Sequence, residues 1–263
     1  MNRLKYLIPA LLLALGFVVY TQYPKLTIIS GYAAKNMAST VFVAGRSAVS
    51  VQSDDHQVPL ISMADASIGA DSRAASASVF GMKPRRAVCR EGLGCVLLPE
   101  GVEDIPYTPE PRRSREEIPL PYPLGHLPPK DSLFPEIDYD RLNSALDLAF
   151  SQAELQRTRT LLVLYKDHLL AERYAEGFGP DTPVLGWSMT KSILATLYGA
   201  LEYRGGMDIG LPTGLAQWQG DARRRITYEQ LLRMQSGLEW DEDYANLSDV
   251  NRMLFTSTDM SAL

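Results

Sequence analysis

Proline spacing is the feature that most limits how this chain can fold. Prolines recur at high density from Pro99 to Pro135, and a mixed-charge cluster at residues 110–117 lies among them. Each proline removes a backbone donor and fixes φ, so neither a regular helix nor a central strand can run through this segment. We therefore expect an extended connector that wraps a surface and precedes a more regular part beginning at Asp138.

Composition and charge restrict the function. The 263 residues are 46% apolar and 22% charged, as in a globular protein, and the net charge is −5. No long basic stretch is present to neutralise phosphates, which excludes nucleic acid as a partner; the short run 223–225 is read as a solvated face. The three histidines are scattered without ligand spacing, so neither a metal nor another cofactor is expected.

The N-terminus carries an export signal. Arg3 and Lys5 precede an apolar run from Leu7 to Tyr20, which is shorter than the ~20 residues of a comfortable membrane span. Residues 1–22 are therefore a signal anchor or a signal peptide, and the lack of a small-x-small site directly after Tyr20 favours the anchor. Either form would place the rest of the chain on the periplasmic side of the inner membrane, anchored or secreted.

The next segment, residues 23–137, is predicted to be an N-terminal extended region that includes the proline-rich connector. Its small residues from 64 to 78 suggest a loop-rich stretch. Cys89 and Cys95 are six positions apart with two glycines between them, and export permits a disulfide. Two unrelated thiols remain the alternative, because pairing depends on geometry.

Residues 138–263 show regular periodicity. Apolar spacing after Asp138 predicts a helix, and the runs 160–165 and 169–174 predict a β-hairpin whose first strand is buried on both faces. Three more segments have helical patterns, capping residues or both: the stripe that follows Ser188 and stops at Gly205, residues 227–234 and residues 248–254.

Ser188 and Lys191 form an S-x-x-K motif at the start of a predicted helix. This spacing is just under one turn, so both side chains lie on one face. Burial beside a nucleophile favours the neutral amine of a lysine, which can then accept the serine proton. The helix N-terminus would add partial positive charge and free N–H groups where an oxyanion develops. The alternative is a capping serine beside a surface lysine.

The stretches 186–192 and 231–238, with the preceding hairpin and the segment 240–244, resemble the β-lactamase-related serine hydrolases. Within that group they are most similar to the 6-aminohexanoate-oligomer hydrolase-like branch of class C-like and penicillin-binding-protein-like members. The resemblance covers residues 138 to 260. It implies an α+β fold of the β-lactamase/transpeptidase type, in which helices flank an antiparallel sheet, with residues 138–263 as the N-terminal half of that domain.

The resemblance also implies a mechanism. Ser188 would be the nucleophile and Lys191 its base, and a small-molecule or peptide amide or ester would be cleaved through an acyl-serine intermediate. Tyr244 and Asn246 superficially match the family's Tyr-x-Asn motif. The position of Tyr244 shortly after Gly237 instead favours a substrate-binding role at the pocket rim, and a tyrosine packed in a loop is the alternative.

One departure from the family pattern concerns the end of the sequence. The family's later Tyr-Ser-type motif and its strand with a Lys-Thr-Gly or His-x-Gly element do not occur before Leu263. The sequence therefore predicts a fold that is incomplete at the C-terminus. Two functions follow: an exported hydrolase seen as a fragment, or an inactive truncated member that binds peptides or cell-wall fragments. A third reading is a structural envelope protein, anchored by residues 7–20, in which the serine–lysine pair is incidental.

Overall fold

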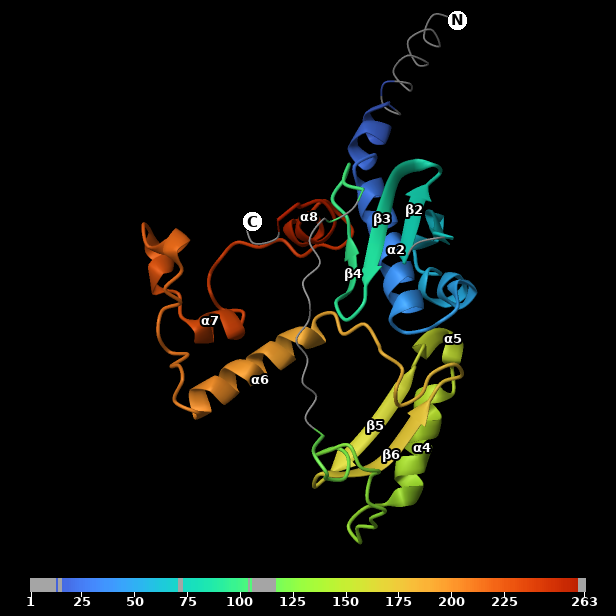
Figure 1. The fold of residues 1–263 in the computed structure, drawn as a ribbon, viewed down its shortest axis with the longest axis vertical. Helices are drawn as coiled ribbons and strands as arrows, with labels where there is room; N and C mark the ends of the chain where they lie inside the picture. Colours follow the sequence, from blue (N-terminus) through green and yellow to red (C-terminus); the bar gives the residue numbers. More distant parts are fainter. Residues whose placement is uncertain (1–12, 14–15, 71–72, 104, 106–116, 260–263) are drawn as a thin grey trace, which may run out of the picture.

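The computed structural model describes residues 13, 16–70, 73–103, 105 and 117–259 (Figure 1). The chain has an α+β fold with two separate antiparallel sheets, one of four strands and one of two. One helix, α2, packs against the four-stranded sheet, and α6 leads from the two-stranded sheet toward α7 (Figure 1).

The N-terminal body is a helix on a sheet. Helix α2 spans Lys25–Phe42, and the sheet follows the order of the chain, β1-β2-β3-β4. These strands span Ala64–Ile68, Ala74–Val79, Met82–Arg90 and Gly94–Leu97. A short helix, α3 (Ala48–Ser50), leads into a π-helical turn, Val51–Asp55, and a 3₁₀ turn, Ile61–Met63, precedes β1.

The small residues from 64 to 78 belong to this sheet, so the predicted loop-rich stretch is wrong. Strands β1 and β2 pair through this segment, with Ala66 opposite Ala77. Both alanines are buried, and they face fully buried alanines and Met37 of α2. Small side chains let the helix lie close to the sheet, so a composition that suggests a loop is here the packing surface of a core.

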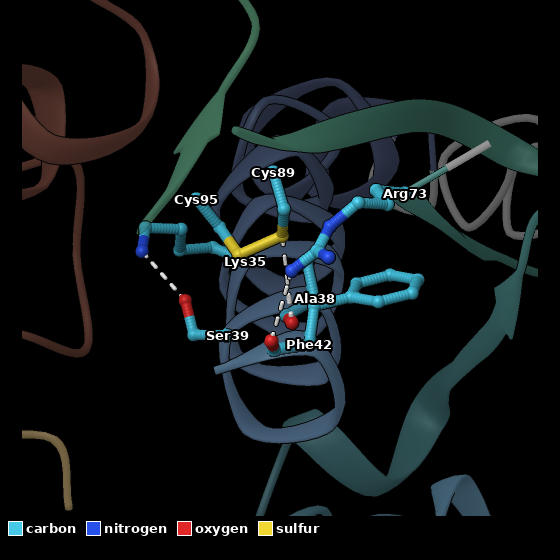
Figure 2. Close-up of a disulfide and its surroundings, with 7 residues drawn as sticks. All are labelled: Lys35, Ala38, Ser39, Phe42, Arg73, Cys89 and Cys95. Atoms are coloured by element: carbon cyan, nitrogen blue, oxygen red, sulfur yellow. Dashed lines mark hydrogen bonds between the residues drawn. A yellow bond between two sulfur atoms is a disulfide. The ribbon is translucent and has the colours of Figure 1, made fainter. Parts of the chain in front are cut away.

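Cys89 and Cys95 form a disulfide, which settles the alternative that the sequence left open. They lie directly opposite each other in register, so the bond joins β3 to β4. Figure 2 shows this disulfide above α2, where the Cys89 sulfur is 3.6 Å from the carbonyl oxygen of Ala38. In the same view Lys35 donates a hydrogen bond of 2.7 Å to Ser39, one turn further along the helix.

The described part of the connector between β4 and Tyr139 contains neither a helix nor a strand, as the prolines predict. A single bridge links Pro121 to Leu127 in this segment.

The C-terminal elements match the predicted order, apart from the short helix α5, which was not predicted. They are α4 (Tyr139–Phe150), α5 (Ala153–Gln156), β5 (Thr160–Tyr165), β6 (His168–Tyr174), α6 (Met189–Tyr203), α7 (Tyr228–Leu232) and α8 (Asp249–Phe255). Two 3₁₀ turns, Ala216–Trp218 and Ala222–Arg225, lie between α6 and α7. Three helices begin at the side-chain caps that the sequence supplies, because Asp138, Thr227 and Ser248 each accept a backbone N–H.

Strand β5 is not buried on both faces, contrary to its apolar pattern. Leu162 is 37% exposed and Leu164 is 46% exposed, so the sheet face that carries them is open to solvent in the described structure. The apolar stripe of α6 is uncovered in the same way: Ile193 is 62% exposed and Leu197 is 58% exposed. Both surfaces have the pattern of core elements, but no described element covers them.

Helix α8 packs on the N-terminal body, across the boundary predicted near residue 138. The ring of Phe255 lies against Gly31 of α2, where an added Cβ would be 3.2 Å from Phe255 Cδ1. The buried guanidinium of Arg85 donates to the backbone oxygens of Phe255 and Leu98. The division into residues 23–137 and 138–263 stays a prediction, and these contacts connect the two parts.

Within the described residues, no helix is both long enough and apolar enough to cross a membrane. The predicted export segment, residues 1–22, lies outside the described residues except for 13 and 16–22.

Candidate active site

Ser188 and Lys191 meet at the start of α6. The Lys191 ammonium donates a hydrogen bond of 2.9 Å to the Ser188 hydroxyl oxygen, so the two side chains share one face of the helix, as their spacing predicts. Ser188 occupies the N-cap position, yet its side chain accepts no hydrogen bond from the helix backbone. Its hydroxyl is therefore not occupied by capping, and its described partner is the lysine.

The helix N-terminus offers fewer free donors than expected. The N–H groups of Met189, Thr190 and Lys191 donate to the backbone oxygens three residues earlier, at 2.9, 3.0 and 3.0 Å. These tight turns occupy the groups that were predicted to face an oxyanion. Among the described hydrogen bonds none comes from the N–H of Ser188 itself, so the Ser188 amide is the donor that remains at this position.

Trp187 holds the turn that presents Ser188. Its φ of 41° lies in the left-handed region, which is uncommon for a bulky residue. Its ring stacks on Tyr32 of α2, with centroids 6.0 Å apart and an angle of 4° between the planes. Burial raises the pKa of Tyr32, and the negative charge of Asp55 raises it further. The N-terminal body therefore supplies a protonated aromatic support directly beside the turn that carries Ser188.

A cavity of about 660 Å³ lies against this turn. Three regions far apart in sequence line it: α2 with the residues just before it, the segment 58–63, and a C-terminal group that includes Ser188, Tyr244 and α8. Its volume is in the range of small-molecule sites, ~300–1,000 Å³. Two of the predicted site residues, Ser188 and Tyr244, thus line the same cavity. Lys191 does not line it, but its ammonium is hydrogen-bonded to Ser188, which does.

The Tyr244 side chain is 59% exposed and lies at the cavity wall. Its hydroxyl donates a hydrogen bond of 2.9 Å to Glu242, which raises the pKa of Tyr244. The single proton of this hydroxyl is held by Glu242, so its oxygen can accept a hydrogen bond from a substrate, but the group does not act as a base. This geometry suits a residue at the pocket rim; the substrate-binding role of Tyr244 stays a prediction.

Asn251 fixes the backbone around Tyr244. Its side chain is 1% exposed, and its amide group donates to the backbone oxygens of Asp243, Tyr244 and Asn246 at 3.2, 3.0 and 2.7 Å. One buried amide therefore holds three carbonyls of the loop. Asn251 also lines the cavity.

The surroundings of the charged groups in the site differ from those that the sequence predicts. Lys191 is exposed, so the burial that favours a neutral amine is not provided by the described residues. Lys25 is the one charged residue among the described residues that line the cavity, and it donates a hydrogen bond of 2.7 Å to the Asn246 side chain. No group of three or more potential metal ligands occurs in the described parts of the chain.

Several site residues were missed in the sequence. Lys25, Tyr32, the segment 58–63 and Asn251 all line the cavity, but none of them belongs to a motif. No local signal marks them, because they are distant in sequence from the S-x-x-K motif and only the packing of α2 and α8 brings them to it.

The C-terminal half of the chain matches known proteins. Residues 156–257 match the family model described as Beta-lactamase. The 6-aminohexanoate-dimer hydrolase of Paenarthrobacter ureafaciens is 32% identical over 114 residues, which is 43% of this chain and 29% of that protein. The match thus spans less than a third of the relative's length. No solved structure matches the chain.

Proposed function

We propose that this chain, whose residues 156–257 match the Beta-lactamase family model, is an exported hydrolase that cleaves amide or ester bonds through an acyl-serine intermediate on Ser188. The observation that carries the proposal is the 2.9 Å hydrogen bond between Lys191 and Ser188 at the wall of a substrate-sized cavity. The amide chemistry agrees with the name of the relative, although the two chains match over only 29% of that relative.

The proposed reaction follows from this geometry. The Ser188 oxygen attacks the substrate carbonyl while its proton passes to the Lys191 amine, and the Ser188 N–H donates to the oxyanion. The tetrahedral intermediate then expels the amine or alcohol, which takes up that proton. Water hydrolyses the acyl-serine ester in a second cycle of the same transfers. Because Lys191 is exposed, the desolvation that favours a neutral amine comes from bound substrate in this proposal.

Export is the second part of the proposal. The N-terminal sequence favours a membrane anchor, and the Cys89–Cys95 disulfide fits an oxidising compartment such as the periplasm. A fusion of alkaline phosphatase after Gly101 tests this placement, because the enzyme becomes active only outside the cytoplasm. An inactive fusion would contradict export.

The alternative function is an inactive member that keeps the cavity for binding. The exposed Lys191 and the uncovered stripe of α6 favour this alternative, since neither is arranged as in a closed catalytic site. Both functions place a ligand in the same cavity, and they differ in whether Ser188 reacts.

Covalent labelling separates the two functions. The purified chain is treated with a fluorophosphonate or a penicillin, and its intact mass is measured over time. We expect one adduct, absent in Ser188→Ala and retained in Ser192→Ala, a matched serine in the same helix. Lys191→Met should slow labelling by about a hundredfold or more, the usual contribution of a general base. A folded sample that gains no mass, or gains it equally in Ser188→Ala, would refute the hydrolase proposal.

A further inference from the structure

A second cavity lies at the C-terminal end of α2, and it shares no described lining residue with the cavity beside Ser188. Its volume is about 240 Å³, below the ~300–1,000 Å³ of most small-molecule sites, so it suits a small ligand. Three cations line it, Lys35, Arg46 and Arg159, and no carboxylate is among its described lining residues. Apolar side chains form a further part of the wall: Val43, Leu93, Phe178, Pro183, Val184 and Leu185.

The two arginines of this second cavity are held in place. The Asp55 carboxylate bonds Arg46 at 2.6 Å and Arg159 at 2.5 Å, and Asp54 is a second partner of Arg46. The ring of Phe178 has its centroid 5.1 Å from the guanidinium carbon of Arg46 and 5.2 Å from that of Arg159. Only Nη2 of Arg159 is used in its described side-chain hydrogen bonds. Its Nε and Nη1 groups therefore remain as donors in a fixed, planar fork.

Lys35 has no carboxylate partner in the described parts of the chain. Its ammonium donates a hydrogen bond of 2.7 Å to the neutral hydroxyl of Ser39, beside the disulfide (Figure 2), and none of the described ion pairs includes it. Burial lowers the pKa of Lys35, so its positive charge is unfavourable here unless an anion lies beside it. Because an ammonium group has three protons, Lys35 keeps donors for a further acceptor.

We propose that the second cavity binds a small organic phosphate monoester, whose phosphoryl oxygens accept hydrogen bonds from Lys35 and Arg159 and whose organic group packs on the apolar wall. A phosphate monoester carries a charge of about −1.5 to −2 and three acceptor oxygens, which suit an ammonium and a guanidinium fork together. A carboxylate has fewer oxygens and less charge, so it would leave donors unused. Free phosphate would satisfy the donors but leave the apolar wall without a contact. The proposal does not depend on whether Ser188 reacts.

Matched ligands test this site by binding. Phenyl phosphate, benzoate, inorganic phosphate and phenol are titrated by calorimetry into the full chain carrying Ser188→Ala, and heats from titrations without protein are subtracted. We expect phenyl phosphate to bind about tenfold more tightly than benzoate, the effect of one further charge-assisted hydrogen bond. It should also bind about tenfold more tightly than inorganic phosphate, because its ring buries apolar surface, and phenol should bind most weakly. Absence of phenyl phosphate binding would overturn the proposal, and so would equal affinity for phenyl phosphate and either benzoate or inorganic phosphate.

Two lysines of the same helix provide a matched comparison. Lys35→Met should lower phenyl phosphate affinity about tenfold or more, whereas Lys25→Met should leave it unchanged, because Lys25 lines the cavity beside Ser188. Affinity that is unchanged in Lys35→Met, or that both variants lower equally, would refute the site.

Urea unfolding separates ligand binding by Lys35 from a structural role. Without ligand, Lys35→Met should be no less stable than the parent chain, because the described side-chain partner that it loses is one neutral hydroxyl. Phenyl phosphate should raise the free energy of unfolding of the parent chain and not that of the variant. Lys35→Gln is the second variant if Lys35→Met does not fold. An equal rise in parent and variant would contradict the role of Lys35.

Discussion

Asn251 provides a direct test of how the loop that carries Tyr244 is held. Its buried amide group donates to the backbone oxygens of Asp243, Tyr244 and Asn246. Asn251→Asp replaces this donor with a carboxylate of nearly the same shape, which has no proton to donate at neutral pH. Asn251→Leu removes the donor without adding a charge, and it is the matched control.

The structure sets the size of each effect. The amide has two protons for three acceptors, so Asn251→Leu loses about two hydrogen bonds, or roughly 2 kcal/mol of the free energy of unfolding. Asn251→Asp loses the same bonds and also leaves a buried, unpaired negative charge beside carbonyl oxygens. We expect it to cost roughly 4 kcal/mol at pH 7, in the range for uncompensated buried charges.

The two variants should also differ in pH dependence. Burial beside carbonyl oxygens raises the pKa of the introduced aspartate in the folded state, so the folded state holds more protons than the unfolded state between the two pKa values. The stability of Asn251→Asp should therefore rise as pH falls through that window, while Asn251→Leu follows the parent chain. Urea unfolding at pH 7 and pH 5 measures both effects. The reasoning would be refuted if Asn251→Asp were as stable as Asn251→Leu at pH 7, or if their difference stayed constant on acidification.

Two further predictions concern the N-terminal body. The Asp55 side chain is 9% exposed and bridges Arg46 and Arg159 at 2.6 and 2.5 Å, whereas Asp54, which also pairs with Arg46 at 3.0 Å, is 58% exposed. Asp55→Asn should therefore cost about 3 kcal/mol in urea unfolding, because the buried Arg46 would keep only the exposed Asp54 as an ion-pair partner, and Asp54→Asn should cost less than about 1 kcal/mol. Equal losses would contradict this assignment. His56 is 3% exposed with neither ring nitrogen hydrogen-bonded in the described structure, and burial lowers its pKa below the ordinary value of 6.5. As pH falls below 6.5, the unfolded chain gains a proton that the folded chain excludes, so the free energy of unfolding falls. The melting temperature should therefore fall less steeply between pH 7.5 and pH 5.5 in His56→Leu than in the parent chain. An equally steep fall in both chains would contradict the prediction.

Local elements of the C-terminal half were predicted from the sequence because their signals are local. Asp138, Thr227 and Ser248 cap helices, and an apolar stripe defines α6. The S-x-x-K spacing likewise determined that Ser188 and Lys191 share a face, since this follows from the helical repeat alone. The membrane segment and the exported location stay predictions.

Burial could not be predicted in the same way, because it depends on what covers an element. The patterns of β5 and α6 are those of core elements, yet Leu164 and Ile193 are exposed in the described structure. Conversely, the alanines of β2 read as a loop and instead form a core against α2.

The sequence by itself determined that Ser188 and Lys191 lie side by side and that the C-terminal half resembles a known family, because each of these signals is carried by short stretches of local sequence. Only the tertiary structure decided what surrounds Ser188. Tyr32 and Lys25 reach the cavity because α2 packs beside the Trp187 turn, and Asn251 reaches it because Gly31 lets α8 lie on α2. Such contacts join residues far apart in the chain, and their free energy depends on the complementary shapes of whole elements rather than on any local pattern.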